Sequence, residues 1–140
     1  MDQEEAGGND FMRTHEFTIA GQTWHLCLNG SALLNAYEKF GDKESLISHL
    51  DGTSKESFEA TCWFLAELAT QGELVRRYQG HNHGKIPTEQ MFRVILAPLD
   101  IAPAKNAVRV ALALGFRREE DDGQPVDLGL LELEKKTVLG

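Results

Sequence analysis

The sequence has no hydrophobic run that approaches the roughly 20 residues of a membrane-spanning helix. It begins Met1-Asp2-Gln3-Glu4-Glu5, which is acidic, whereas a secretory signal begins basic and then turns apolar. Cysteine is scarce, and Cys27 and Cys62 both stand in apolar segments, where a thiol packs as a small hydrophobic side chain. We therefore expect a soluble, intracellular protein, not held in a membrane, whose cysteines are buried thiols rather than a disulfide.

Positive charge is also scarce, with 14 Lys and Arg residues against 22 Asp and Glu residues and a net charge of −8. A surface that binds nucleic acid needs the opposite sign, because contacts from Lys and Arg to phosphate supply most of the affinity. The basic pair Arg117-Arg118 is followed directly by four acids, at 119–122. We expect no nucleic-acid partner, and we expect the acidity to favour solubility.

Recognisable catalytic patterns are absent as well. The sequence contains no Gly-x-Ser-x-Gly, phosphate loop or dinucleotide-binding glycine pattern. Ser31 and Ser54 are placed to cap helices, and apolar surroundings raise the pKa of a thiol and so make it a poor nucleophile. Glu67 and Glu73 could form an acid–base pair, but a solvated helix face explains them better. We expect no enzyme and no cofactor.

Histidine suggests a metal site at one place. His81 and His83 share the polar, glycine-flanked loop 79–85, but a metal site needs three or four ligands, and Asp, Glu and Cys are not clustered nearby. We expect a solvated loop and no metal. His25 and His49 are expected at the surface.

What the chain does have is an ordinary globular composition, 41% hydrophobic and 26% charged, over 140 residues. This predicts one mainly α domain, with a small N-terminal β-hairpin packed on a bundle of about five helices. Residues 1–15 are expected to form a flexible leader. Residues 16–116 should form the hairpin and helical domain, and 117–140 an acidic linker with an apolar tail.

The central helix is predicted over residues 53–74. Thr53-Ser54-Lys55-Glu56 is typical of a capping box, in which a hydroxyl accepts a backbone N–H and Glu56 returns the bond. Apolar residues then recur with helical period, and residues 62–66 are apolar all the way round, so other elements should cover this helix from several sides. Gly72 is expected to end or kink it.

The hairpin and the shorter helices flank this element. Residues 17–19 and 24–28 alternate as two strands around Ala20-Gly21, where a two-residue turn and a longer loop are both open because Ala resists positive φ. Helices are expected after Asn29, over 43–50, after Thr88, and from Pro103 to Gly115. Leu34 and Ile47 should point inward. The expected core is Trp24, Leu26, Leu33, Tyr37, Phe40, Phe58, Cys62, Leu65, Phe92, Ile95, Val108 and Leu112.

The C-terminal tail carries leucines that have no core of their own. They follow the acidic, turn-rich linker 119–125 and dock either onto the domain or onto a partner. These candidate partner-binding residues are Leu128, Leu130, Leu131 and Leu133.

The order of these segments is similar to a known family. Residues 16–26 read EFTIAGQTWHL, and residues 32–41 read ALLNAYEKFG, a helix that ends in an aromatic residue and glycine. A short helix and a long apolar one follow. This resembles the tail assembly chaperones of long-tailed bacteriophages and prophages, over residues 16–136, through packing motifs rather than catalytic ones.

The resemblance implies a non-enzymatic protein of the host cytoplasm that is absent from the mature virion. It implies binding to the tape-measure protein, recruitment of tail tube protein during tail morphogenesis, and self-association. We expect the tail leucines, with exposed parts of the hairpin and of the last helices, to hold the partner. Two alternatives stay open: a structural tail or head-completion component retained in the virion, and a small intracellular protein-binding adaptor.

Overall fold

The computed structural model of the chain describes residues 14–123, and their side chains as far as residue 117. This part consists of a two-stranded antiparallel hairpin, five α-helices and one short 3-10 helix. The predicted fold class, a mainly α protein with a small N-terminal hairpin, is confirmed. The expected leader, apart from residues 14 and 15, and the apolar tail beyond 123 lie outside the described residues.

The hairpin pairs β2 (His15–Ile19) with β3 (Gln22–Leu26), and Phe17 stands opposite Trp24. Its turn has two residues, Ala20 at φ 53° and Gly21 at φ 75°. Positive φ at both positions matches the right-handed twist of the strands, so the shorter of the two alternatives forms even though alanine resists it. Phe17 and Trp24 are buried against the helices.

The central helix α4 (Lys55–Tyr78) begins and ends later than predicted. Its N-cap is Ser54, whose hydroxyl accepts the Ser57 N–H at 3.1 Å. The third helical position is therefore Ser57 and not Glu56, so the predicted capping box is wrong. The helix also continues through Gly72. A Cβ at this position would overlap the carbonyl oxygen of His25 in β3. Gly72 lets a strand approach the helix and does not end it.

Two short helices precede α4, namely α2 (Gly30–Phe40), capped by Asn29, and α3 (Lys43–Leu50). The expectation that Leu34 and Ile47 point inward is wrong, since their side chains are 66% and 41% exposed. In α2 the fully buried positions are Ala32 and Ala36. Small side chains there bring the helix close to its neighbours and turn Leu34 outward.

Three elements follow α4: α5 (Glu89–Ile95), η1 (Pro98–Asp100) and α6 (Ile101–Gly123). Thr88 caps α5 as predicted, its hydroxyl accepting the Met91 N–H at 3.0 Å. The prediction that the last helix ends at Gly115 is wrong. The Leu28 side chain occupies the space of a Cβ at Gly115, so this glycine serves close packing, and residues 117–123 of the expected linker are helical.

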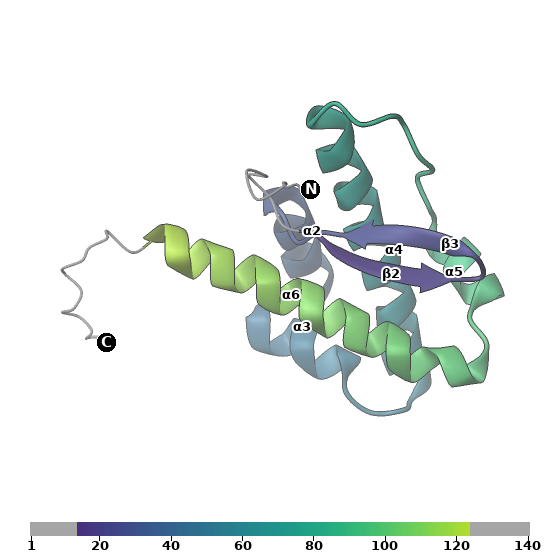
Figure 1. The fold of residues 1–140 in the computed structure, drawn as a ribbon. Coiled ribbons are helices and arrows are strands. Elements are labelled where there is room, and N and C mark those ends of the chain that lie inside the picture. Colours follow the sequence, from purple (N-terminus) through teal and green to yellow (C-terminus); the bar gives the residue numbers. More distant parts are fainter. Residues whose placement is uncertain (1–13, 124–140) are drawn as a thin grey trace.

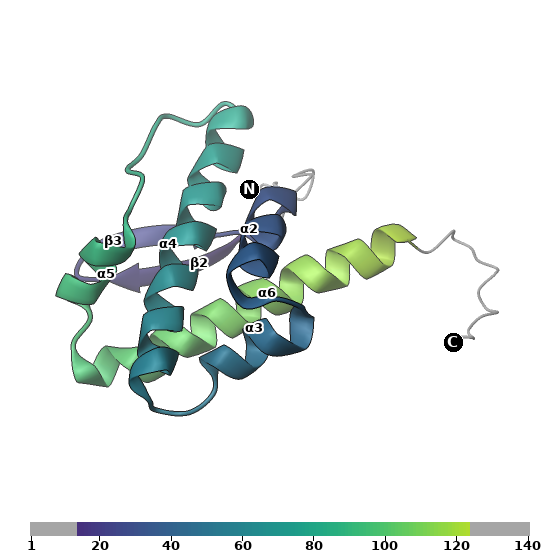
Figure 2. The same cartoon turned by 180° about the vertical axis from the view of Figure 1, so that it is seen from behind.

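The core lies around α4, which packs against β3, α2, α3, α5 and α6. Figure 1 shows α6 crossing in front of α4, and Figure 2 shows α4 from the opposite side; in both views the C-terminal end of α6 projects beyond the other helices. Of the predicted core, the buried residues are Trp24, Leu26, Cys62, Leu65, Phe92, Val108 and Leu112. Those that are partly buried and packed against it are Leu33, Tyr37, Phe40, Phe58 and Ile95.

Candidate functional site

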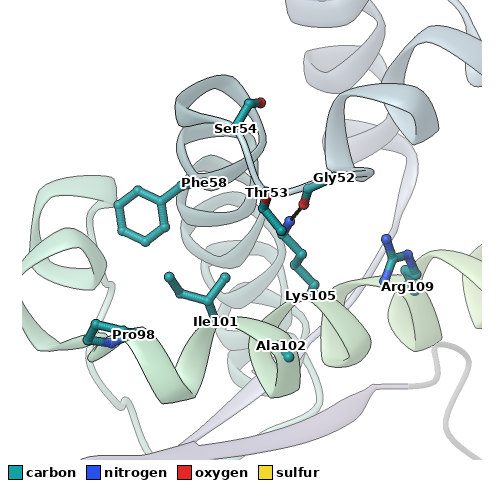
Figure 3. Close-up of a pocket in the computed structure, with 9 residues that line it drawn as sticks. All are labelled: Gly52, Thr53, Ser54, Phe58, Pro98, Ile101, Ala102, Lys105 and Arg109. Carbon is teal, nitrogen blue, oxygen red and sulfur yellow. Dashed lines mark hydrogen bonds between the residues drawn. The ribbon is translucent and has the colours of Figure 1, made fainter.

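A groove with a volume of about 520 Å³ opens between the N-terminal ends of α4 and α6. Figure 3 shows Phe58 of α4 and Ile101 of α6 pointing toward one another across it. Pro98 and Ala102 extend the apolar wall along η1 and the first turn of α6. The remaining lining residues belong to the loop before α4 and to α6, where two of them are basic. They are Gly52, Thr53, Ser54, Lys105 and Arg109.

The apolar rim of the groove follows from the turn that leads into α6. Pro98 begins the 3-10 helix, and the Asp100 carboxylate accepts the Ala97 N–H at 2.8 Å, which fixes this turn. Leu99 stands between them with 90% of its side chain exposed. Leu99 is not one of the residues that line the groove, and a single exposed apolar side chain is common on protein surfaces.

The opposite end of the groove is cationic. Lys105 is buried, with 7% exposure, and its ammonium group donates a hydrogen bond to the Gly52 carbonyl. An ammonium group has three N–H donors, so this bond leaves donors for a further acceptor. Arg109, farther along α6, donates to the Asp51 carboxylate at 3.1 Å. These two contacts also tie the α3–α4 loop to α6 and so set the width of the groove.

Ser57 holds the loop between α3 and α4 through its side chain. Its hydroxyl lies 2.8 Å from the Leu50 carbonyl oxygen and 3.1 Å from that of Gly52. Thr53 and Ser54, at the start of α4, line the groove together with Lys105, so the positive end of the helix dipole and the ammonium group belong to the same groove. Apolar walls beside a cationic end suit an apolar segment that carries a carboxylate.

The carboxylate Glu73 does not lie on a solvated helix face, so that prediction is wrong. It is 7% exposed, and its Oε2 accepts the Gly84 N–H at 2.5 Å and the Arg77 Nε–H at 2.9 Å. Burial alone would raise the pKa of Glu73, but the bonds from Gly84 and Arg77 outweigh it and hold the pKa below its usual range. Glu73 thus anchors the loop that follows α4.

Glu67, the other half of the suggested acid–base pair, has partners of its own. Its Oε2 accepts from Asn35 at 2.7 Å and from Gln71 at 3.3 Å. These are bonds between helices and within a helix, which serve packing. The two glutamates are each committed to different neighbours.

The histidines within residues 14–117 do not gather at one site. His81 and His83 are exposed, and within residues 14–117 no group of three or more His, Cys, Asp and Glu side chains is arranged to hold a metal ion. His49 is exposed as predicted, with its ring 4.8 Å from that of Phe40. His25 is partly buried rather than at the surface, and burial, followed by the charge of Arg76, lowers its pKa.

Cys27 and Cys62 are both buried and not joined to each other. Burial raises the pKa of the Cys62 thiol to about 11, which confirms the prediction that its surroundings oppose thiolate formation. The Cys27 N–H donates to the Leu68 carbonyl at 3.0 Å and fastens the end of β3 to α4. Both cysteines serve the core.

The proposed partner-binding residues Leu128, Leu130, Leu131 and Leu133 lie outside the described residues. The groove was not predicted from the sequence, although Pro98, which lines it, marks the turn before the last helix. Within residues 14–117, the exposed large apolar side chains are Leu34, Ile47, Leu74, Tyr78, Ile86, Val94 and Leu99.

No helix within residues 14–123 has the length and apolarity needed to cross a bilayer. The chain matches no protein-family model, no curated protein and no solved structure.

Proposed function

We propose that this protein is a tail assembly chaperone that binds the tape-measure protein and helps to recruit tail tube protein during tail morphogenesis. It acts without catalysis in the host cytoplasm and does not remain in the mature virion. The proposal begins from the resemblance of residues 16–136 to that family. The observation that supports it best is the groove whose apolar wall is formed by Phe58, Pro98 and Ile101.

A tape-measure chain is long, helical and apolar until the tail tube covers it, so its chaperone has to cover apolar side chains and keep the complex in solution. The groove between Phe58 and Ile101 is large enough for a few such side chains. A net charge of −8 favours solubility of the complex.

The groove alone would bind such a client weakly. Three buried leucines contribute roughly 5–9 kcal/mol, at about 1.5–3 kcal/mol each. Association costs on the order of 4–15 kcal/mol, which offsets from about half of this gain to all of it. A second contact is therefore part of the proposal, and the four tail leucines at 128, 130, 131 and 133 supply it.

The proposal is tested by co-expressing the chain with the tape-measure protein encoded in the same genome. The wild-type chain should keep that protein soluble and co-purify with it. Ala102→Glu should reduce co-purification at least tenfold, because Ala102 is exposed and lines the groove, so the change puts charge there. Val94→Asp is the matched control, since Val94 is also exposed and apolar but lies on α5.

Three outcomes contradict parts of the proposal. Equal co-purification of the groove variant and the control shows that the groove is not the contact. Unchanged co-purification after removal of residues 125–140 removes the tail leucines from the contact. Failure of the wild-type chain to bind or solubilise the tape-measure protein, or its presence in purified virions, contradicts the chaperone function itself.

A further inference from the structure

We propose that the chain's own segment around Leu131 and Leu133 occupies the groove between α4 and α6 while no partner is bound. The groove is apolar along Phe58 and Ile101 and cationic at Lys105, and an occupant should match both properties. The inference concerns one molecule by itself and does not depend on the identity of a client.

The charge of the segment is complementary to the groove. Residues 124–134 contain Asp127, Glu132 and Glu134 and no basic residue. The groove presents Lys105 and the N-terminal end of α4, while the charge of Arg109 is shared with Asp51. A carboxylate of the segment can therefore accept a hydrogen bond from Lys105 while the neighbouring leucine packs against Phe58 and Ile101.

The length of the segment selects which leucines can reach. From Gly123 back to Arg109 and Lys105, α6 covers 14 and 18 residues, about 21 and 27 Å at 1.5 Å per residue. Leu131 and Leu133 follow Gly123 by 8 and 10 residues, which extend to about 26 and 33 Å at most. Leu128, five residues on, reaches only about 17 Å and stops short of the groove.

The apolar wall at the start of α6 limits how far the docked segment can extend. Pro98 and Ile101 line the apolar wall at the N-terminal end of α6. Ile101 lies 22 residues before Gly123, about 33 Å along α6, which equals the reach of the fully extended chain to Leu133. Docking would cover apolar surface that is otherwise in contact with water, and it would place Glu132 or Glu134 beside Lys105.

Occupation of the groove by the chain itself has a regulatory consequence. A client that uses the groove must displace the segment, and the displaced leucines then become available to the same client. One event would thus open two contacts. This fits a protein that must avoid associating through its apolar surfaces before its client is present.

The docking is measurable in the full-length chain by paramagnetic broadening. A nitroxide is attached to a cysteine introduced by Asn106→Cys, on the exposed turn of α6 between Ala102 and Arg109. The native cysteines are buried and should react slowly. Amide signals of residues 130–134 should lose most of their intensity.

Two controls define this result. The same label at Tyr78→Cys lies at the other end of α4, roughly 35 Å from its first turn, and should leave these signals unchanged. Leu131→Asp with Leu133→Asp should abolish the broadening from position 106. Thr137→Asp with Val138→Asp adds the same charge to the tail and should preserve it.

Equal effects of the labels at 106 and 78 would overturn the proposal. A mixed sample, in which the nitroxide and the isotope are on different molecules, tests the intramolecular assignment. If the broadening in that sample is as strong as when one molecule carries both the nitroxide and the isotope, a second copy supplies the segment. This result also overturns the proposal. Persistent broadening in the double aspartate variant would show that the leucines do not hold the segment.

Discussion

Replacing Gly72 by alanine should destabilise the protein, although the change improves intrinsic helix propensity. In an exposed helix interior, alanine is favoured over glycine by about 1 kcal/mol. At Gly72, however, the new Cβ would overlap the His25 carbonyl oxygen, which belongs to the backbone of β3 and cannot rotate away. The strand must move outward as a whole.

The size of the effect follows from the contacts around this approach. Overpacking typically costs about 1–3 kcal/mol, and a backbone obstacle belongs at the upper end of that range. Moving β3 also weakens the bond from the Cys27 N–H to the Leu68 carbonyl, worth about 1 kcal/mol. After subtracting the gain in helix propensity, Gly72→Ala should lower the free energy of unfolding by about 3 kcal/mol.

Chemical denaturation followed by circular dichroism measures this change, and thermal unfolding should shift downward on the order of 10 °C. Gly30→Ala is the matched control, because Gly30 is the first residue of α2 and a Cβ there meets no heavy atom within 4 Å. Its stability should be unchanged or greater by up to about 1 kcal/mol. A Gly72→Ala variant as stable as the wild type would refute the close approach of β3 to α4.

Three further predictions concern buried groups. Glu73→Gln should lower the free energy of unfolding at pH 7 by about 1–2 kcal/mol in denaturant titrations, because it weakens the charge-assisted bond from Gly84. Since folding lowers the pKa of Glu73 from 4.5, its stabilising effect is present above pH 4.5 and lost as the pH falls through the folded-state pKa; a variant–wild-type difference that persists in acid would contradict this. Cys62, with a pKa of about 11, should be alkylated at pH 8 at least about 100-fold more slowly in the folded than in the unfolded chain, as followed by mass spectrometry, and equal rates would show that it is accessible. Phe92→Ala should cost about 3–5 kcal/mol and change tryptophan fluorescence, because Phe92 is fully buried with its ring 5.6 Å from that of Trp24; a loss below 1 kcal/mol would place it outside the core.

The elements that local signals define were predictable. Thr88 was expected to cap a helix because a side-chain oxygen three residues ahead of an N–H is a local arrangement, and it does. The helical period around Cys62 and Leu65 likewise predicted a helix covered from several sides, and both are fully buried. Such patterns need no knowledge of distant residues.

The glycines and glutamates show where local reasoning fails. Glycine is common where helices end, and this is why Gly72 and Gly115 were predicted to end theirs. Their role is decided instead by their neighbours in space, the His25 carbonyl and the Leu28 side chain. Glu73 was expected on a solvated face because helices often carry charge outward. Its carboxylate instead accepts a hydrogen bond from the Gly84 N–H, eleven residues later in the chain. In each case the deciding partner belongs to another segment.

The groove could not be derived for the same reason. Its walls come from residues 52–58 and 98–109, which are about 45 residues apart and meet because α4 and α6 cross. The sequence shows Phe58 and Ile101 as apolar positions of two helices. Which part of each apolar face is left uncovered depends on the crossing geometry, which composition and period do not encode.

The position of α4 has a consequence for how the molecule opens. Because this one helix touches β3, α2, α3, α5 and α6, no neighbour can separate from it without exposing side chains that the others also cover. The backbone amides in the middle of α4 should therefore exchange with deuterium only when the entire domain unfolds, whereas those in the turns of η1 should exchange through local fluctuations.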